Sequence, residues 1–342
     1  MNCIMIDFRQ TLTRIAADYG CATADILPLS HQVRAELAGE FAKNDLTSYP
    51  GYISETAQFR ADPLRLFPWA RSVISVAFPF SSLPDSDYVF PEAESAEFAG
   101  KIAGYALKKD YHSAGRKILE EMVRVLKVET KISFRSEICI DTAPVAERII
   151  AKFAGIGIQG KNMNILVPGF GSGCFLAEIF TDLETPELPP AAEIPSPCVS
   201  CGRCIRVCPS GALQNDGCFE CSRCISHLTM EKRGMLTREE QQILGSWIFG
   251  CDQCTSCCPD TILPLPFLID LKYLLEVPSS ELKRAIRGTA LEYAGTTLLR
   301  RNALAVLGNK NTPATKELIQ RFAAKTGSRL LRETAENLLN VY

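Results

Sequence analysis

Hydrophobic and polar positions along the first half of the chain alternate between strand and helix spacing. Ser72–Phe78 and Phe134–Ile140 are β-branched and apolar enough to form buried strands, and Met163–Val167 and Cys174–Phe180 have the same character. Over Tyr111–Val128, apolar residues recur at the spacing of one helix face. The pattern predicts an N-terminal domain that mixes helices and strands, of α+β or α/β architecture.

A further helix is predicted at Thr142–Phe153, directly after the second of these strands. Asp141 or Thr142 could cap its first turn, which tolerates Pro144, and Gly155 would end it. Asp141 would then lie at the carboxyl end of a strand, where ligands bind in α/β sheets, and its carboxyl group could donate a proton. The alternative interpretation is that Asp141 serves only as the helix cap.

The strand pattern fades after Pro259, and the segments that follow are predicted to be helices. These segments are Phe267–Leu275, Ser279–Arg287, Thr296–Leu307 and Thr315–Thr326. Within them, residues 300–309 resemble the second helix of a HEAT-like unit, and only one or two such units fit in the remaining length.

Charge is unevenly distributed along the chain, whose net charge is −2. From Glu281 to Tyr342, eleven Lys and Arg stand against five Asp and Glu, a balance of +6. One interpretation is an anionic partner, nucleic acid above all, with Arg300 and Arg301 contacting its phosphates. The other is a helical region with solvated basic side chains.

Cysteine spacing is the strongest chemical signal. Eleven of the 15 cysteines lie between Cys198 and Cys258. They include Cys198-x2-Cys201-x2-Cys204-x3-Cys208-Pro209 and, further on, Cys251-x2-Cys254-x3-Cys258-Pro259. Three thiolates at i, i+3 and i+6 can hold three irons of one [4Fe–4S] cluster, while a fourth before proline ligates a second cluster. Zinc, the alternative, has no use for the extra x3-Cys-Pro.

Cross-ligation of this kind divides the cysteines into two sets. One set is Cys198, Cys201, Cys204 and Cys258, and the other is Cys208, Cys251, Cys254 and one further cysteine. Cys218, Cys221 and Cys224 are themselves spaced i, i+3 and i+6, so spacing alone does not choose among them. Cys257 is left over and is expected to be a packing residue. Two adjacent clusters would conduct single electrons to a site of chemistry.

Composition and prolines outline the organisation. Charged residues make up 22% and hydrophobic ones 46%, which is typical of a soluble globular protein. No apolar run approaches the roughly 20 residues of a membrane span, and Met1–Gln10 lacks a signal-peptide pattern, so we expect no membrane and a reducing, cytoplasmic setting. Five prolines lie within Glu184–Pro197 and suggest a linker. The predicted divisions are 1–183, the linker 184–197, 198–265 and 266–342.

Several motifs in order along the chain resemble those of the epoxyqueuosine reductase family. They are Phe59-Arg60-Ala61-Asp62-Pro63, Asp110-Tyr111-His112, Cys139-Ile140-Asp141-Thr142-Ala143-Pro144 with Glu147-Arg148, Gly160-Lys161-Asn162, Phe170-Gly171-Ser172, Arg223-Cys224-Ile225-Ser226 with Leu228-Thr229, and Gly250-Cys251-Asp252 leading to Cys258-Pro259. The resemblance covers nearly the whole chain. It departs from many members at Gly157-Ile158-Gln159-Gly160, which lacks a tryptophan, and in a shorter helical tail.

The resemblance implies an α+β protein with three parts. They are an α/β cobalamin-binding domain like that of reductive dehalogenases at 1–183, a bacterial ferredoxin-like 2[4Fe–4S] domain at 198–265, and a helical HEAT-like region at 266–342 that binds tRNA. Its implied activity is the reduction of epoxyqueuosine to queuosine at the wobble position of tRNA, by base-off cobalamin that two [4Fe–4S] clusters reduce.

The resemblance also implies roles for particular residues. The family's proton donor falls on Asp141, and its remaining cluster ligand falls on Cys224. Its cobalamin contacts fall on Arg60, Asp141, Arg148 and Lys161 and on a segment with Ser226, Thr229 and Lys232. A general acid must stay protonated near neutrality, and stacking under a corrin would raise the pKa of Asp141.

The expected partners are tRNA carrying epoxyqueuosine and a low-potential electron donor not identified by the sequence, and the chain is expected to be a monomer. The main alternative is another cobalamin and iron–sulfur reductase, such as a reductive dehalogenase acting on a small organohalide. That class is usually exported with a twin-arginine leader, a pattern absent here. A second alternative is an electron-transfer adaptor that performs no chemistry itself.

Overall fold

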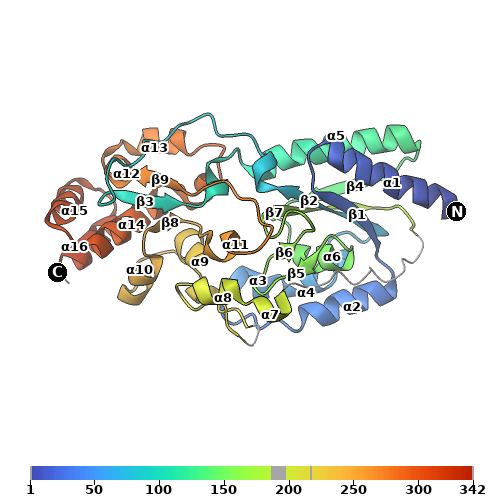
Figure 1. Ribbon diagram of the computed structural model, residues 1–342, viewed down its shortest axis with the longest axis horizontal. Helices are drawn as coiled ribbons and strands as arrows, with labels where there is room; N and C mark the ends of the chain where they lie inside the picture. Colours follow the sequence, from blue (N-terminus) through green and yellow to red (C-terminus); the bar gives the residue numbers. More distant parts are fainter. Residues whose placement is uncertain (1, 186–197, 216–217, 341–342) are drawn as a thin grey trace. The chain divides into compact units, whose positions relative to one another are not determined.

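The computed structural model describes residues 2–185, 198–215 and 218–340 (Figure 1). The linker predicted at 184–197 lies, beyond Thr185, outside the described residues. The chain forms two compact units: residues 1–83, 111–206 and 255–262 make up unit 1, and residues 84–110, 207–254 and 263–342 make up unit 2. The boundaries of these units differ from those of the predicted ranges, because the cysteine-rich segment 198–265 contributes to both units.

Unit 1 is built on a four-stranded sheet with the strand order β1-β2-β7-β4. Its strands are β1 (Thr23–Pro28), β2 (Ser72–Pro79), β4 (Ser136–Cys139) and β7 (Cys174–Thr181). Every pairing is antiparallel, with Ile74 opposite Ile26 on β1 and Ile179 on β7. The mixed α and β composition expected from the sequence is confirmed. Asp141 does follow the carboxyl end of β4, but the rule that ligands bind at that edge concerns parallel strands and does not apply to this antiparallel sheet.

Helices cover both faces of this sheet (Figure 1). On one face, Ile74, Val76 and Ile179 pack against α1 (Asn2–Asp18) and α5 (Tyr111–Thr130). On the other, Val73 and Phe180 pack with residues of α2 (His31–Phe41) and α6 (Glu147–Phe153). Because successive residues of a strand point to opposite faces, all eight residues of β2 are buried. A polar residue on the α6 face of this sheet is therefore placed in a protein interior.

The remaining elements of unit 1 are short. They are α3 (Gly51–Glu55), α4 (Ala57–Ala61), η1 (Pro63–Arg65), η2 (Phe80–Ser82), β5 (Ile158–Gln159), β6 (Ile165–Leu166), α7 (Cys198–Cys201) and most of α8 (Arg203–Val207); α11 (Gln253–Ser256) crosses the boundary between the units. The strand predicted at Met163–Val167 is thus only β6, which pairs with β5 in a two-residue ladder.

The helix predicted at Thr142–Phe153 begins five residues later than expected, at Glu147. Residues 140–146 form a loop instead, in which Asp141 has a left-handed backbone with φ of 56°. Ala146 occupies the cap position and makes no side-chain cap. The alternative role of Asp141 as a helix cap is therefore wrong. Gly155, with φ of 77°, follows the last helical turn as expected.

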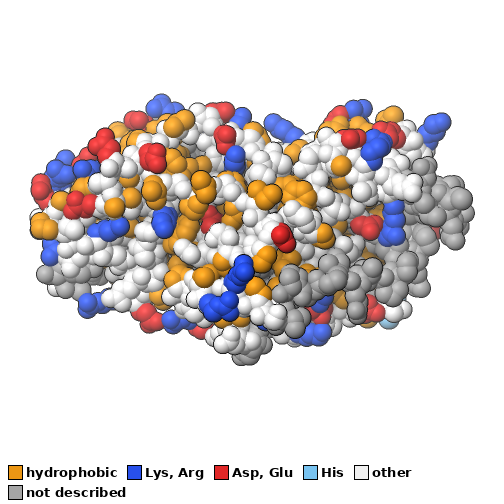
Figure 2. All heavy atoms as spheres, viewed as in Figure 1, with side chains coloured by type: hydrophobic (Ala, Val, Ile, Leu, Met, Phe, Trp, Pro, Cys, Tyr) orange, Lys and Arg blue, Asp and Glu red, His pale blue; other side chains and the backbone are white. Residues whose placement is uncertain are grey.

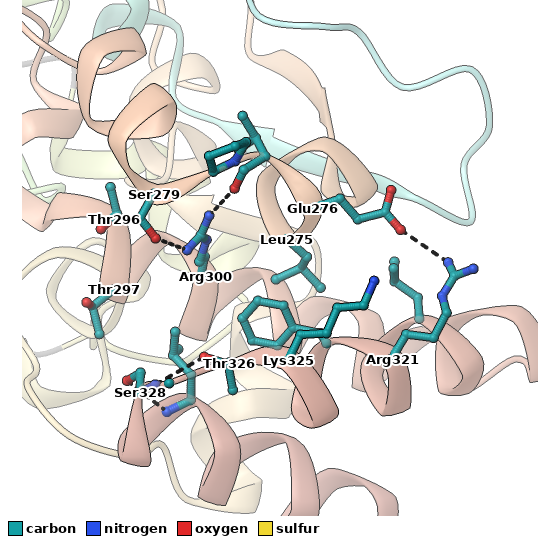
Figure 3. A pocket seen from close by; sticks show the side chains of 16 residues that line it. Leu275, Glu276, Ser279, Thr296, Thr297, Arg300, Arg321, Lys325, Thr326 and Ser328 are labelled. Atoms are coloured by element: carbon teal, nitrogen blue, oxygen red, sulfur yellow. Dashed lines mark hydrogen bonds and ion pairs between the residues drawn. The ribbon is translucent and has the colours of Figure 1, made fainter.

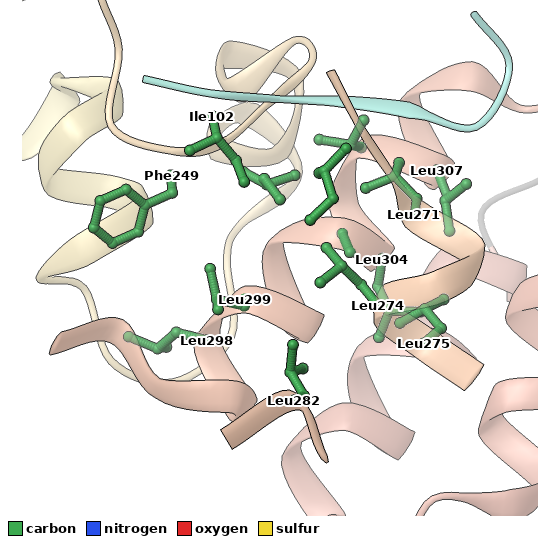
Figure 4. Packing of buried hydrophobic residues seen from close by; sticks show 14 of the residues in the cluster. Ile102, Phe249, Leu271, Leu274, Leu275, Leu282, Leu298, Leu299, Leu304 and Leu307 are labelled. Atoms are coloured by element: carbon green, nitrogen blue, oxygen red, sulfur yellow. The ribbon is translucent and has the colours of Figure 1, made fainter. Parts of the chain in front are cut away.

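Unit 2 combines a three-stranded sheet, of order β8-β3-β9, with a group of helices. The strands are β3 (Ala99–Ile102), β8 (Trp247–Phe249) and β9 (Phe267–Asp270). The helices are η3 (Gly104–Leu107), η4 (Cys221–Arg223), α9 (Ile225–Met230), α10 (Arg238–Leu244), α12 (Leu271–Glu276), α13 (Ser279–Ala285), α14 (Leu291–Lys310), α15 (Pro313–Lys325) and α16 (Arg329–Asn340). Leu271, Leu274, Leu299 and Leu304 form the centre of its core with Phe249 (Figure 4).

Apart from α16, which was not predicted, the C-terminal helices follow the predicted segments with two corrections. Phe267–Leu275 is not a single helix, since its first four residues form β9, which pairs antiparallel with β3. The strand pattern therefore continues past Pro259. The helix α14 starts earlier than predicted and is kinked at Gly295, whose φ is 66°. Among the described residues, no helix is both long and apolar enough to cross a membrane.

Candidate functional site

The loop that follows β4 presents Asp141 to two side chains from the start of α5. The Tyr111 hydroxyl donates a hydrogen bond of 2.7 Å to Oδ2 of Asp141, and Nε2 of His112 lies 3.6 Å from the same oxygen. The Tyr111 ring is itself fixed, because it stacks nearly parallel on Phe175 of β7 at a centroid distance of 4.0 Å. The motif Asp110-Tyr111-His112 thus supplies the partners of the carboxylate singled out in the sequence.

These partners favour the ionised form of Asp141. His112 lowers the pKa of Asp141 most, burial works in the opposite direction, and the Tyr111 hydrogen bond lowers it further. Burial is the second-largest effect, but the hydrogen bonds with His112 and Tyr111 and the charges of His112 and Arg60 together outweigh it, so the net shift of the Asp141 pKa is downward. The sequence led us to expect a raised pKa beneath a corrin. In the protein without a cofactor the pKa of Asp141 is lowered instead, because two proton-bearing side chains face its carboxylate.

Two glutamates lie beneath the Asp141 loop, and sequence analysis did not single out either as functional. Glu147 opens α6, and its Oε1 accepts a 2.6 Å hydrogen bond from the backbone N–H of Asp141. Glu178, on β7, is fully buried, and the Ser75 hydroxyl donates to its Oε1 at 3.4 Å. Burial raises the pKa of Glu147 to about 8 and that of Glu178 well above its usual range. The sequence does carry a signal for Glu178, because it is a carboxylate in the middle of an otherwise apolar strand.

Cationic side chains surround the same loop. Arg60, on α4, donates to the backbone oxygen of Val145 at 3.1 Å, and Arg148 donates to that of Met163 at 2.7 Å. Burial lowers the pKa of Arg60, while the negative charges of Glu147 and Asp141 work against that shift. Arg60, Asp141 and Arg148 are therefore brought together in unit 1.

The first predicted cysteine set lies within unit 1. Cys198, Cys201, Cys204 and Cys258 line one cavity, together with Lys161, Asn162, Leu166, Gly202, Arg203 and Pro259. In the part of the chain that the structure describes, no three His, Cys, Asp or Glu side chains stand close enough to hold a single metal ion. A four-iron cluster is larger than an ion and needs thiolates arranged around a cavity, so this donor set fits it. Lys161 joins this cavity.

A glycine motif supports the last cysteine of this set. Ser172 and Thr261 hydrogen bond to the thiol of Cys258, and the Ser172 backbone N–H donates to the Thr261 hydroxyl at 3.0 Å. Gly171 has φ of 57°, and a Cβ there would lie 2.2 Å from the Thr261 hydroxyl oxygen. The motif Phe170-Gly171-Ser172 therefore needs its glycine for backbone conformation and for close approach to the Cys258 turn.

The second predicted cysteine set lies within unit 2. The thiols of Cys224 and Cys251 are close enough to interact electrostatically with each other and with Cys208. Burial disfavours ionisation of Cys208, but hydrogen bonds from Ser210 and from backbone N–H groups outweigh it and lower its pKa. Cys218 is exposed, and Cys221 lies in η4. The grouping favours Cys224 as the partner of Cys208 and Cys251.

Spare Cys257 lies beside the first set. The thiols of Cys204, Cys258 and Cys201 raise its pKa, in addition to a larger effect of burial. Cys257 is therefore a neighbour of the predicted ligands, and its role as a packing residue stays a prediction.

Residues of the predicted cobalamin segment at 226–232 belong to unit 2. The Thr229 side chain is fully buried, and its hydroxyl donates to the Ile225 oxygen and accepts from the Gly250 N–H at 3.0 Å. The Thr229 hydroxyl thus already donates one hydrogen bond and accepts another within unit 2. Thr229 is therefore not available as a cofactor contact. Ser226 is half-buried, and Lys232 forms an ion pair with Glu240 at 2.5 Å.

The expectation that Arg300 and Arg301 contact RNA phosphates is wrong, because both side chains are buried. Arg301 is fully buried and donates to the backbone oxygens of Leu228, Lys232 and Gly234. Arg300 borders a cavity of about 690 Å³ in unit 2, but its guanidinium is directed to Ser279 and to backbone oxygens (Figure 3). Arg321 and Lys325 of α15 line the same cavity, and Arg321 pairs with Glu276.

Two family models match the chain. One, described as "4Fe-4S double cluster binding domain", matches residues 197–261, and the other, described as "Epoxyqueuosine reductase QueG, DUF1730", matches residues 60–142. The first covers every predicted cluster ligand. The second contains Arg60, the Tyr111–His112 pair and Asp141.

Relatives with known names agree with these matches. The epoxyqueuosine reductase of Pseudomonas aeruginosa is 31% identical over 83% of this chain and 81% of its own. A crystal structure of an epoxyqueuosine reductase with an epoxyqueuosine-modified tRNA-Tyr stem loop superposes with a TM-score of 0.81 at 25% identity, over 98% of this chain and 90% of that one. A Bacillus subtilis structure, described with its catalytic aspartate loop swung out of the active site, gives 0.79 at 25% identity over 97% and 90%.

Proposed function

The chain belongs to the epoxyqueuosine reductase family, and from that premise we propose that it reduces epoxyqueuosine to queuosine in tRNA, with Asp141 as the proton donor. The observation that carries the assignment of Asp141 is its position in a loop between Tyr111, His112 and Glu147. Removal of the epoxide oxygen consumes two electrons and two protons and yields a carbon–carbon double bond and water. A positioned acid is required at the departing oxygen.

The cysteine sets are proposed to hold two [4Fe–4S] clusters. The first would be bound by Cys198, Cys201, Cys204 and Cys258 and the second by Cys208, Cys224, Cys251 and Cys254. The shared cavity of the first set and the mutual proximity of Cys208, Cys224 and Cys251 support this division. Such clusters supply electrons one at a time.

Cobalamin is the proposed cofactor of unit 1, in its base-off form. When bound, it would supply a metal centre that can act at the two-electron level. The donor set fits: the cations Arg60, Arg148 and Lys161 suit the phosphate and carboxamide groups of its periphery. Ser226 and Lys232 stay contacts predicted from the sequence alone, without Thr229.

The residues of this chain have distinct tasks in the proposed reaction. Asp141 would carry the proton on its carboxyl group and release it to the epoxide oxygen. Tyr111 and His112, both facing Oδ2, would orient that carboxyl group and stabilise the carboxylate left behind. Glu147 would hold the backbone of the loop.

The setting of the reaction is also proposed. A tRNA substrate and oxygen-sensitive thiolate ligands suit the cytoplasm. A separate low-potential donor would supply the electrons, and the chain would act as a monomer.

The experiment is anaerobic turnover of defined tRNA. Protein reconstituted with iron, sulfide and cobalamin is reduced and mixed with tRNA carrying epoxyqueuosine, and the nucleosides are analysed by mass spectrometry. Conversion to queuosine is expected, and conversion should be lost in Cys201→Ala, which removes a ligand but no part of the acid site. Dehalogenation of small organohalides without queuosine formation would instead support the dehalogenase-like alternative, and no corrin absorption after reconstitution would support an electron-transfer adaptor.

A further inference from the structure

Unit 2 contains a cavity of about 690 Å³ whose lining includes no residue assigned to the proposed reaction (Figure 3). The cavity lies where α14 meets the turn between α12 and α13 and the turn between α15 and α16. Sites for small organic molecules usually have volumes of about 300–1,000 Å³. The cavity is therefore large enough for an organic ligand and not only for a single ion.

Arg300 of α14 forms the buried wall of this cavity and is only 8% exposed. Its guanidinium donates to the backbone oxygens of Leu274 and Val277 and, at 2.6 Å, to the Ser279 hydroxyl. These bonds use three of its five N–H groups. The other two have no acceptor among the described residues, and no carboxylate there pairs with the guanidinium. A buried charge without a counter-charge is costly, so an anion in the cavity would stabilise it.

Two further cations line the cavity from α15. Arg321 and Lys325 lie four residues apart and so share one face of that helix. Arg321 pairs with Glu276, the one carboxylate of the lining, at 3.2 Å, and it lies 3.7 Å from Glu317, which is outside the lining. Three cations and one carboxylate give the lining a net charge of +2. A phosphate monoester carries a charge of about −1.5 to −2 at pH 7, which matches this value.

The rest of the lining suits a sugar and a flat apolar group. Leu318, Phe322 and Leu331 supply an apolar wall. Hydroxyl groups, which exchange hydrogen bonds with sugar and phosphate oxygens, come from Ser279, Thr296, Thr297, Thr326 and Ser328. A free phosphate ion would use the cations but would leave the apolar wall and most of the volume empty. The combination of a cationic end with an apolar wall is typical of sites for small organic anions.

We propose that this cavity binds a nucleoside monophosphate, with the phosphate held by Arg300, Arg321 and Lys325 and the base packed against Phe322. The phosphates of a tRNA are the other source of the same charge. A folded tRNA keeps its bases stacked, so its backbone would reach the exposed ends of Arg321 and Lys325 but would not cover the apolar wall. The inference goes beyond the proposed function and does not depend on it.

Calorimetric titration of the full chain, loaded with iron and sulfide and kept anaerobic, tests the site. The probes are AMP, GMP, CMP and UMP, each compared with its nucleoside and with inorganic phosphate. At least one monophosphate should bind at one site per chain, and its affinity should fall as salt increases. The matching nucleoside and free phosphate should bind at least about tenfold more weakly, because each lacks one half of the contacts. Absence of binding by all four monophosphates would overturn the proposal.

Variants locate the bound nucleotide. Lys325→Met removes one cation but keeps most of the side-chain stem, and it should weaken binding by about tenfold. Lys316→Met, on the same helix but outside the cavity lining, changes the net charge equally and should bind as the wild type does. Thr297→Trp, at an exposed position of the lining, should fill the cavity and abolish binding. Wild-type affinity in both Lys325→Met and Thr297→Trp would place the nucleotide elsewhere and overturn the proposal.

Melting temperatures and an RNA titration complete the test. A monophosphate that binds the native cavity should raise the melting temperature of the wild type and leave that of Thr297→Trp unchanged. An RNA stem loop should bind Lys325→Met as it binds the wild type. Weaker binding of the stem loop by Lys325→Met, with no binding of any monophosphate, would assign these cations to RNA and overturn the proposal. Failure to form queuosine would overturn the proposed function alone, because the titrations do not involve turnover.

Discussion

The Tyr111 hydroxyl donates a 2.7 Å hydrogen bond to Oδ2 of Asp141 from the first residue of α5. The tyrosine ring is held by Phe175, which belongs to the sheet rather than to a loop. A side chain in a left-handed turn is thereby tied to a rigid element, and its carboxyl oxygens have fixed directions. Such preorganisation is what a positioned acid needs, because the reacting distance must be kept within a fraction of an ångström.

Tyr111→Phe should weaken turnover and raise the pKa of Asp141. His112 and Tyr111 both favour the carboxylate, so loss of the hydroxyl shifts the pKa upward toward its ordinary value. Loss of one orienting hydrogen bond should reduce the single-turnover rate by about tenfold. Carbon-13 NMR of labelled aspartate in cofactor-free protein measures the pKa. Tyr19→Phe on α1 is the matched control, and an unshifted Asp141 in Tyr111→Phe would contradict the role of the hydroxyl.

Asp141→Asn should bind cobalamin but turn over slowly. Asparagine adopts the left-handed backbone readily, so the loop conformation should be retained. It cannot supply an acidic proton, and turnover of epoxyqueuosine in tRNA should fall by roughly 10²–10⁴-fold. Near-wild-type rates under single-turnover conditions would remove the catalytic role. Helix capping is no longer a competing explanation, because α6 begins at Glu147.

Motifs in the sequence identified Asp141, but its surroundings depend on distant segments. Periodicity predicted β2, β7 and α5, because their apolar residues lie at strand or helix spacing throughout. It did not predict that Glu147 lies close enough to Glu178 to affect its pKa, since their proximity depends on how α6 packs on the sheet. The direction of the Asp141 pKa shift likewise depends on Tyr111 and His112, which lie about thirty residues away in the chain.

Counting charges could not separate buried from exposed cations. Arg301 counted toward the basic balance of the C-terminal region, yet it is fully buried against backbone oxygens. Helical spacing also failed at Phe267–Asp270, because pairing with β3, about 170 residues earlier, outweighs local preference. Where tertiary contacts determine the secondary structure of a segment or the burial of a side chain, a local sequence pattern contains too little information to predict them.

Cys224→Ser should remove one cluster, whereas Cys218→Ser should remove none. Cys224 lies near Cys208 and Cys251, while Cys218 is exposed. After full reconstitution, the wild type should contain about eight irons and Cys224→Ser about four. Iron analysis with EPR of the reduced protein makes the measurement. Retention of both clusters in Cys224→Ser, with loss in Cys221→Ser, would reverse the assignment.

Arg301→Met should destabilise unit 2 and lower the iron content of the second cluster. The substitution leaves the buried oxygens of Leu228, Lys232 and Gly234 without their donor, and these follow Cys224 along α9 and its C-terminal turn. Each unsatisfied oxygen costs about 1–3 kcal/mol, so the free energy of unfolding should fall by at least about 3 kcal/mol. Urea denaturation and iron analysis test this, with exposed Arg287→Met as the control. Unchanged stability would show that the buried guanidinium is dispensable.

The tRNA interface should depend on exposed basic residues of the C-terminal helices. On the face seen in Figure 2, basic and acidic side chains are interspersed, so the basic balance does not form one continuous patch there. Arg321 and Arg329 are engaged in ion pairs with glutamates. Lys283, Arg284 and Arg287 instead form an exposed basic group at the end of α13 and just after it. We therefore expect this group, rather than Arg300 and Arg301, to contact phosphates.

Charge reversal of Lys283 and Arg284 to glutamate should weaken tRNA binding and reduce its salt dependence. Each phosphate contact releases counterions, so losing two should lower the slope of log affinity against log salt by about 1.4–1.8. Cobalamin absorption and iron content should not change. Reversal of Lys117 and Arg124 on α5 changes the net charge equally and is the control. Equal weakening in both double variants would mean that net charge, and not this group, governs binding, and a salt-independent wild-type affinity would exclude phosphate contacts as its main source.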